Sequence, residues 1–477
     1  MMTRGDSVLS DIGEYVTETR HTPVVREVDV LVAGGGIAGC FAAIAAARMG
    51  ARTLVVDRFG QLGGNMGPGL IAGGTLAYFR SIVGGKPALV KEFLRRVHAA
   101  RGPHLGNVRK AGAASFVATR MLLDAGAEIL LSTHLCDPIV SDGTVQGLFI
   151  ENKSGRQAIL ARTVLDASGE ADVAARAGAP MLRATDVVSP EIIAAMEQLK
   201  PHFPQWSGTE LSRFCGLPSF GCGFQVAGID GARVQEDQDS GARASVDESF
   251  QQERVIEGLG TIFFSPSPSQ LAARCDPESE LVEGSLGASG ETAVGKVRTD
   301  PGNGDHMSQL ELHARLYLYE VVEQLRAAVP GFEQAYVAQV APYLHCRGGT
   351  CIDGEYFVTA VDMLNRSRFA DVIFVPALVD DRGRQIGPSC DVPFRSMLPQ
   401  GLDGLLAIGR SASHRRLLRT RPNCMLYGIA AGTAAAMAAR DGATARTVDR
   451  PALQQQLLDA GVYLGDQARL AELSLSA

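Results

Sequence analysis

One segment near the start of the chain has the order strand, glycine turn, helix, strand and acid. Residues 28–33 form an apolar run typical of a buried strand, and Gly34, Gly36 and Gly39 follow with Gly-x-Gly-x-x-Gly spacing. In such a unit the first glycine allows a tight turn, the second lets a phosphate approach the backbone, and the third lets the helix pack on the sheet. The segment therefore predicts a Rossmann-type unit that binds a dinucleotide at a helix N-terminus.

The second strand of this unit, residues 53–57, ends at Asp57. A carboxylate at this strand end can accept hydrogen bonds from a ribose diol. Because the residue is an aspartate and no arginine stands in its place, a 2′-phosphate and hence NADP are not expected.

Periodicity and turn residues predict the remaining elements. Helices are expected over residues 40–49, 115–125, 170–177, 313–328 and 423–440, strands over 128–135, 163–169 and 405–410, and hairpins over 137–160. The predicted fold class is α/β, with a discontinuous Rossmann-like domain and an inserted α+β substrate domain. The expected boundaries are 25–180 and 396–445 for the first domain, 181–395 for the second, 1–24 for a leader and 446–477 for a C-terminal helical segment.

Composition excludes several classes of partner and site. The net charge is −7 and no apolar run is long enough to cross a membrane, so neither nucleic acid nor membrane is expected as a partner. The nine cysteines include no Cys-x-x-Cys pair, which argues against an iron–sulfur cluster, a structural zinc or another metal site. Their odd number and scattered spacing favour a reducing cytoplasm.

The fingerprint alone does not separate FAD from NAD, but two later stretches favour FAD. Residues 165–172 and 405–410 read as strands that run into glycine turns, and the second precedes an Ala/Gly-rich helix that begins near Asn423. The N-terminus of such a helix can face the N1/O2 edge of a flavin and stabilise the negative charge of the reduced ring.

The sequence resembles the FAD-dependent oxidoreductases of the group that includes the flavoprotein component of heterodisulfide reductase, within the wider glutathione-reductase-like flavoproteins. The matching motifs are the fingerprint at 29–39, Gln-Leu-Gly-Gly-Asn at 61–65, and the stretches 164–178, 354–359 and 423–436. The resemblance implies a glutathione-reductase-like fold with FAD as its cofactor. The predicted cofactor-binding residues are Gly34, Gly36, Ile37, Ala38, Gly39, Asp57, Arg58, Gly63, Gly64, Asn65, Leu135, Ser168, Gly169, Gly409, Arg410, Asn423 and Cys424.

Two departures from the family pattern limit what the resemblance implies. Family members often carry an Arg-Glu-Thr-Arg run where this chain has Arg-Gly-Gly-Thr at 347–350, and the iron–sulfur cysteines of heterodisulfide reductase are absent. The chemistry of any one member is therefore not carried over to this chain.

Three residues are predicted to be catalytic. His345 is a candidate proton carrier, Arg347 a candidate bidentate partner of a substrate carboxylate, and His414 a candidate anion anchor beside the flavin. The alternatives are a structural pair for the first two and a solvated loop for the third.

The predicted function is hydride transfer between flavin and a small organic substrate. A substrate that carries a carboxylate would suit Arg347. The alternatives are a flavin monooxygenase and a non-catalytic electron-transfer flavoprotein that serves a partner. A homodimer is expected. Only one dinucleotide fingerprint occurs, so the sequence identifies no electron partner.

Overall fold

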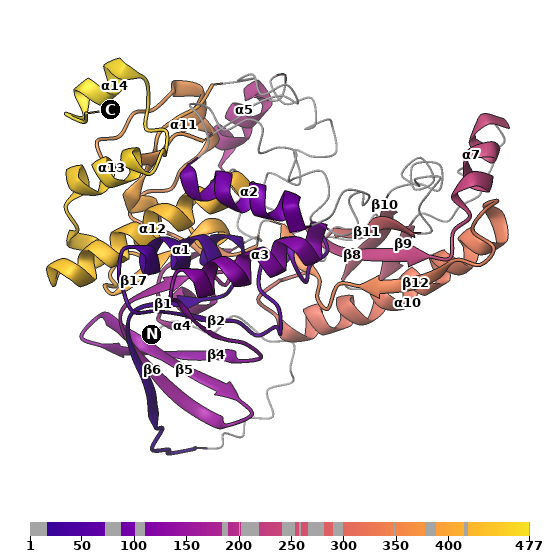
Figure 1. Cartoon of the computed structure of the whole chain (residues 1–477), viewed down its shortest axis with the longest axis horizontal. Coiled ribbons are helices and arrows are strands. Elements are labelled where there is room, and N and C mark those ends of the chain that lie inside the picture. The colour runs from indigo at the N-terminus through magenta and orange to yellow at the C-terminus, as the bar shows by residue number, and fades with distance from the viewer. Residues whose placement is uncertain are drawn as a thin grey trace.

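In the described part of the chain, the computed structural model has two large sheets, one built mainly from the two ends of the chain and the other from its middle, and two small sheets of two strands each (Figure 1). The structure describes residues 17–71, 87–100, 110–183, 189–199, 201, 219–240, 253–256, 259–265, 281–289, 299–347, 349–376, 388–414 and 418–476. The first 16 residues of the predicted leader lie outside these ranges, and residues 17–23 precede the first strand without regular structure.

The first sheet contains a parallel half with the order β3-β2-β1-β6, and β17 also pairs with β6. β1 (Val24–Ala33) lies between β2 (Thr53–Val56) and β6 (Gly155–Asp166), and each of these pairings is parallel. β3 (Glu128–Leu130) and β17 (Leu405–Ala407) extend the parallel part on its two sides. The apolar strands are buried on both faces, as a parallel sheet requires.

The antiparallel half of this sheet consists of β4 (His134–Ser141) and β5 (Thr144–Asn152), which continue from β6. The sequence predicts one strand over 128–135, and this prediction is wrong. The chain turns between β3 and β4 because Ser132 adopts φ 51°, and the Thr133 hydroxyl donates to the Leu131 carbonyl. β3 therefore stays beside β2, whereas β4 turns to pair with β5.

Helices α1 (Ile37–Arg48) and α12 (Arg421–Asp441) lie side by side on one face of the parallel strands (Figure 1). Glycines allow their backbones to touch. A Cβ on Gly428 would lie 2.3 Å from the Ala38 carbonyl oxygen, and one on Gly432 would lie 2.1 Å from that of Ala42. This contact places the N-terminus of α12 next to that of α1, although 384 residues (421 − 37) separate them in the sequence.

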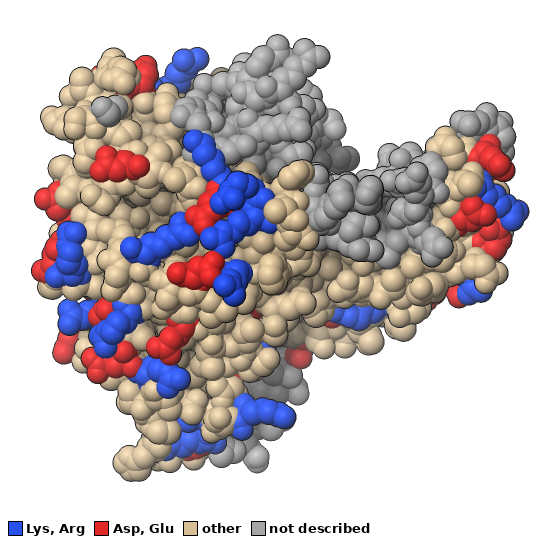
Figure 2. Space-filling model, viewed as in Figure 1, with Lys and Arg blue, Asp and Glu red and all other residues tan. Residues whose placement is uncertain are grey.

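Two further helices, α2 (Ala88–Ala100) and α3 (Lys110–Asp124), cover α1. Basic side chains gather over them on the face shown in Figure 2. Arg48 and Arg96 both pair with Glu92, and Arg96 and Arg120 both pair with Asp124, so the ion pairs join α1, α2 and α3. Each such surface pair contributes little stability on its own.

The second domain is an antiparallel sheet with the order β12-β8-β11-β10-β9, and β13 also pairs with β8. A 25-residue helix, α10 (Gly304–Ala328), packs against it, nine residues longer at its start than the sequence predicts because Asn303 caps it. The other elements are α7 (Gly231–Ser240), β8 (Ser219–Ala227), β9 (Glu253–Ile256), β10 (Gly260–Ser265), β11 (Leu281–Ser289), β12 (Tyr336–Val340) and β13 (His345–Arg347).

Shorter elements complete the described part of the two domains. These are η1 (Gly64–Met66), α4 (Asp172–Arg176), β7 (Met181–Leu182), α5 (Pro190–Leu199), β14 (Cys351–Ile352), α11 (Ala360–Asn365), β15 (Val372–Phe374), β16 (Val392–Pro393), η7 (Phe394–Met397) and η8 (Gly409–Ser411). The buried side chains of α11, β15 and β16 belong to the hydrophobic core of α1 and α12, whereas those of β8, α10 and β13 form a core of their own. The predicted domain boundaries stay a prediction, but buried apolar residues within 358–374 and 390–394 pack with the first domain.

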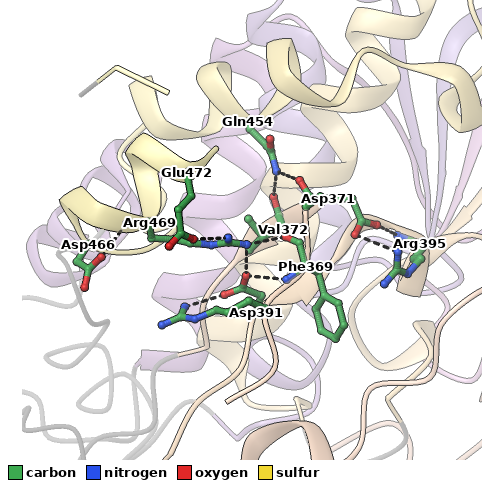
Figure 3. A network of polar contacts seen from close by, with 11 residues as sticks. Phe369, Asp371, Val372, Asp391, Arg395, Gln454, Asp466, Arg469 and Glu472 are labelled. Carbon is green, nitrogen blue, oxygen red and sulfur yellow. Dashed lines mark hydrogen bonds and ion pairs between the residues drawn. The ribbon is translucent and has the colours of Figure 1, made fainter. Parts of the chain in front are cut away.

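The C-terminal segment consists of η9 (Ala445–Thr447), α13 (Arg450–Asp459) and α14 (Gln467–Glu472). A buried carboxylate fixes α14 to the first domain (Figure 3). Asp391 is fully buried, and its oxygens accept hydrogen bonds from Arg469 at 2.8 Å, Arg368 at 2.9 Å and the Phe369 amide at 3.0 Å. Gln454 of α13 donates to the Val372 carbonyl beside this cluster. No helix in the described part of the chain is long and apolar enough to span a membrane.

Candidate cofactor and substrate site

The glycine turn between β1 and α1 leaves a backbone surface with free space above it. Gly34 has φ 109°, and a Cβ on it would lie 2.7 Å from the Ala167 carbonyl oxygen, so only glycine fits. A Cβ on Gly39 would lie 1.9 Å from the Gly34 carbonyl oxygen. A Cβ on Gly36 would meet no atom within 4 Å. Gly34 and Gly39 are therefore needed for packing, whereas a side chain at Gly36 would enter a space that the described residues leave open.

Asp57 holds this turn. One carboxylate oxygen accepts a hydrogen bond from the Gly35 amide at 2.7 Å, and the other accepts one from the Phe59 amide at 2.8 Å. Burial raises the pKa of Asp57 above its ordinary value, while these two amides oppose the shift. The structure thus gives Asp57 a role in shaping the glycine turn, and its contact with a ribose stays a prediction.

A second glycine-rich loop lies against the first. Gly63 and Gly64 both have positive φ, and the Gly63 amide donates to the Gly35 carbonyl at 2.8 Å. A Cβ on Gly64 would lie 2.9 Å from the Gly36 Cα. The two glycine turns therefore form one continuous backbone wall. Gly73 and Gly74, which the sequence places in the same loop, lie outside the described residues.

The second domain contributes Tyr343 to this loop. The Tyr343 hydroxyl donates to Asn65 Oδ1 at 2.8 Å, and its ring stacks on Phe59 with centroids 4.6 Å apart. The Arg58 guanidinium lies over both rings, 4.7 Å from the Phe59 centroid and 5.5 Å from that of Tyr343. The predicted residues Arg58 and Asn65 are thus held by a side chain from the other domain.

The turn after β6 is fixed by side-chain hydrogen bonds. Asp166 is fully buried and accepts from the Ser168 hydroxyl at 2.6 Å and from the Ala174 amide at 2.9 Å. Burial raises its pKa to about 6. The Ser411 hydroxyl accepts from the Gly169 amide at 3.1 Å, which joins this turn to η8. Because Ser168 accepts from the Asp172 amide, the helix predicted from residue 170 begins at Asp172.

An ion pair forms where three segments cross. Glu170 Oε1 lies 3.0 Å from Arg410 Nη2, and Glu170 Oε2 accepts a hydrogen bond from the Thr350 amide at 3.1 Å. A Cβ on Gly349 would lie 1.4 Å from this carboxylate, so a larger residue at this position would displace the Glu170 side chain. Burial raises the pKa of Glu170 to about 7, although Arg410 opposes the shift. Arg410 Nη1 is buried and has no hydrogen-bond partner among the described residues.

The N-terminus of α12 faces the same region. The helix follows Thr420, and the side chain of this residue does not cap the first amides of the helix. Asn423 is fully buried, and neither its Oδ1 nor its Nδ2 has a hydrogen-bond partner in the part of the chain that the structure describes. Such a buried amide is costly unless a ligand or water completes its hydrogen bonds. Burial raises the pKa of the neighbouring Cys424 thiol to about 11, so this cysteine is not a thiolate near neutral pH.

His414 has a structural role in the loop before α12. Nε2 lies 2.7 Å from the Gly409 carbonyl oxygen, and Nδ1 accepts from the Leu418 amide at 3.3 Å. A carbonyl can only accept, so Nε2 carries the proton and the ring is the neutral tautomer. Its exposed fraction is 1% and its ring stacks on Tyr427. One ring nitrogen thus contacts Gly409 and the other contacts Leu418, and the role of His414 as an anion anchor stays a prediction. The neighbouring Arg415 and Arg416 lie outside the described residues.

The other two predicted catalytic residues lie on β13. His345 is buried, and its ring lies against Gly221 of β8, where a Cβ would be 2.3 Å from the ring Cε1. β13 ends at Arg347, three residues before Thr350, whose amide donates to Glu170, so the end of β13 lies near the ion pair. The side chain of Arg347 lies outside the described residues. The roles of His345 and Arg347 stay predictions.

Glu170 supplies a pH-dependent contribution to stability. Its pKa is raised in the folded protein, so this contribution is complete below about pH 4.5 and is lost as the pH rises towards 7. Between pH 4.5 and about pH 7, we expect the unfolding free energy of the cofactor-free wild type to fall by about 3 kcal/mol relative to that of Glu170→Gln. Urea unfolding at stepped pH measures the difference, with the exposed Glu191→Gln as a control that should follow the wild type. Parallel curves for wild type and Glu170→Gln would contradict the burial argument.

Comparison with known proteins identifies the family. The model of the family described as "FAD dependent oxidoreductase" matches residues 29–457, which include both ends of the first domain. The chain belongs to this family. It is an FAD-dependent oxidoreductase enzyme, and FAD is its cofactor. The subgroup suggested by the sequence stays a prediction.

Several solved structures align with most of this FAD-dependent oxidoreductase. A geranylgeranyl bacteriochlorophyll reductase-like protein from Thermoplasma acidophilum is 15% identical with a TM-score of 0.40, over 91% of this chain and 83% of that one. A flavin-dependent brominase is 14% identical with a TM-score of 0.38, over 91% and 84%. The p-nitrophenol 4-monooxygenase of Pseudomonas putida is 13% identical with a TM-score of 0.38, over 94% and 92%.

The residues of the site fit FAD. The open space at Gly36 suits a diphosphate at the N-terminus of α1, which has no side-chain cap. The buried Arg410 Nη1 and the Asn423 amide are donors and acceptors that a polar cofactor could complete. Ile37 and Ala38 begin α1, and Leu135 lies on β4, where its carbonyl accepts from Arg176.

Sequence reasoning missed several residues that shape the site. Tyr343 and Phe59 carried no motif, and only the fold brings them together. Glu170 follows the predicted Ser-Gly turn, so its place was visible, but its partners Arg410 and Thr350 were not.

Proposed function

We propose that this enzyme transfers a hydride between FAD and a small organic substrate that carries a carboxylate. The site is the region between the two glycine turns, β13 and the start of α12. We also infer that the first domain is of the glutathione-reductase-like type, because a single βαβ fingerprint is completed by a distant glycine turn and helix at the other end of the chain. FAD would supply the ring atom that accepts or donates the hydride.

The cofactor-binding roles follow from the free space and the unpaired atoms. Gly36 would leave room for the diphosphate, and Arg410 would donate to it through Nη1. Asn423 would complete its hydrogen bonds on the polar edge of the flavin ring. The N-terminal amides of α12 would favour negative charge on the reduced ring.

Positive charge in the site is the observation that supports a carboxylate substrate. Burial raises the pKa of the Tyr343 hydroxyl, and Arg410, Arg58 and Arg421 oppose that shift. Arg410 and Arg421 also act on the Cys424 thiol, together with Arg419. The Arg58 guanidinium lies over the Tyr343 ring, and Arg410 pairs with Glu170 but keeps Nη1 without a hydrogen-bond partner among the described residues, so these two cations favour an anionic ligand.

Anaerobic titration of the purified flavoprotein tests the proposal. Small oxidisable carboxylic acids and their methyl esters would be compared by the bleaching of the long-wavelength flavin band. We expect acids to bleach the flavin at concentrations roughly 100-fold lower than the matching esters, since a paired buried charge is worth about 3 kcal/mol. Equal responses to acid and ester would overturn the carboxylate assignment.

The same preparation separates the two alternative functions. A monooxygenase would consume NAD(P)H and oxygen and insert an oxygen atom into the product. An electron-transfer flavoprotein would show no bleaching by any organic substrate, and its flavin would respond to a reduced iron–sulfur protein.

A further inference from the structure

Helix α10 has a second apolar face that the described residues leave open. Leu310, Ala314, Tyr317, Leu318, Val321, Val322 and Leu325 are buried against the second sheet. On the opposite side Leu312, Leu316 and Tyr319 have exposed fractions of 55%, 52% and 58%. In Figure 1, α10 runs along the lower edge of the second domain with the sheet above it. Apolar side chains that repeat along one outer face are typical of an interface.

The exposed stripe follows the spacing of a coiled coil. Seven exposed residues succeed one another at alternating intervals of four and three, and they are Asp305, Gln309, Leu312, Leu316, Tyr319, Glu323 and Arg326. This is the a/d pattern by which one helix packs along another. The three apolar residues occupy the centre of the stripe, and polar residues occupy both ends.

We propose that this stripe pairs with the same stripe of a second copy of the chain, antiparallel, across a two-fold axis near Leu316. Two-fold symmetry places residue i of one copy opposite residue j of the other, with i + j nearly constant along the helix. Leu316 then meets Leu316, and Leu312 meets Tyr319 on both sides of the axis.

Charge complementarity selects a second copy as the partner. In the same register Asp305 in the first turn of α10 lies opposite Arg326 in its last turn, and Gln309 lies opposite Glu323. The Asp305–Arg326 pair joins opposite charges, the Gln309 amide is positioned to donate a hydrogen bond to the Glu323 carboxylate, and each pair occurs twice in the dimer. The antiparallel arrangement also places the positive end of each helix dipole beside the negative end of the other.

The ion pair that Arg326 makes within its own helix is weak enough for Arg326 to pair with Asp305 of a second copy instead. Arg326 pairs with Glu323 of its own helix at 3.0 Å, but the two side chains are 43% and 71% exposed. Such a pair contributes little, so Arg326 can turn towards Asp305 of a second copy at small cost.

Sedimentation of the FAD-loaded full-length protein over a range of concentrations tests the interface. We expect a dimer for the wild type and a monomer for Leu316→Glu, because the axis brings the two introduced carboxylates together. The control is Phe116→Glu, which places the same charge on a 63% exposed side chain of α3 and should leave the dimer intact. Flavin content reports whether each variant is folded. A monomeric wild type, or a Leu316→Glu variant that stays dimeric, would overturn the proposal.

Two further variants define the register. Asp305→Arg and Arg326→Asp should each weaken the dimer, by roughly tenfold in Kd, and together they should restore it. Leu316→Cys should form a disulfide-linked dimer on mild oxidation, whereas Phe116→Cys should not. Absence of both the rescue and the crosslink would exclude the antiparallel register.

Discussion

The variant Gly36→Val should fold normally and fail to bind FAD. A Cβ on Gly36 would meet no atom of the described residues within 4 Å, and the residue has φ −71° and ψ −170°, an extended conformation open to any residue. The cofactor-free fold should therefore tolerate valine. The added methyl groups would occupy the space that the diphosphate needs, and we expect the Kd for FAD to rise by roughly 100-fold or more, about 3 kcal/mol.

Fluorescence titration of FAD into the cofactor-free protein gives the Kd, and urea unfolding without FAD gives the stability. Gly112→Val is the matched control, since Gly112 lies on the exposed side of α3 and an added Cβ also meets nothing within 4 Å. It should bind FAD like the wild type. Gly39→Val should also lack FAD, but because the protein does not fold. Its Cβ would collide with the Gly34 carbonyl oxygen. Full flavin occupancy in Gly36→Val would show that the diphosphate lies elsewhere.

The first βαβ unit could be predicted because all its determinants lie within residues 28–57. Each glycine there meets a steric requirement of the turn itself. The apolar patterns that predict the flanking strands and helix extend over only a few residues. The site beyond this unit depends on contacts across long stretches of sequence. Ser411 and Gly169 are 242 residues apart, and Tyr343 and Asn65 are 278 apart, so no local pattern could pair them.

The surroundings of His414 could not be predicted for a related reason. A His-Arg-Arg run between a strand and a helix suggested an anion site, but sequence carries no information on where each imidazole nitrogen points. The fold turns the ring inward onto Tyr427, and its two nitrogens contact Gly409 and Leu418. Arg410 and Asn423, two of the residues with buried atoms that have no hydrogen-bond partner among the described residues, stand four residues before and nine residues after it.

The close contact of α1 with α12 explains why small residues recur along α12. This contact brings Gly409 and the start of α12 next to the start of α1, where a Cβ on Gly409 would lie 2.8 Å from the Ala38 Cβ. The two halves of the cofactor site are therefore aligned by helix packing, and a change in that packing should affect both stability and FAD binding.

Gly432→Ala tests this coupling. The new Cβ would lie 2.1 Å from the Ala42 carbonyl oxygen and 2.8 Å from its carbonyl carbon, so the backbones of α1 and α12 must separate. We expect the unfolding free energy of the cofactor-free protein to fall by about 3 kcal/mol. We expect the affinity for FAD to fall as well, by roughly tenfold, because the two helix N-termini move apart.

The control, Gly112→Ala, makes the same chemical change, but we expect it to stabilise the protein. Gly112→Ala places a methyl group on an exposed helical position with nothing within 4 Å, and it should raise the unfolding free energy by about 0.5–1 kcal/mol through helix propensity. Urea unfolding of both variants measures the contrast. If Gly432→Ala were as stable as the wild type, α1 and α12 could not be in backbone contact. If it were destabilised with unchanged FAD affinity, the contact would support the fold without aligning the cofactor site.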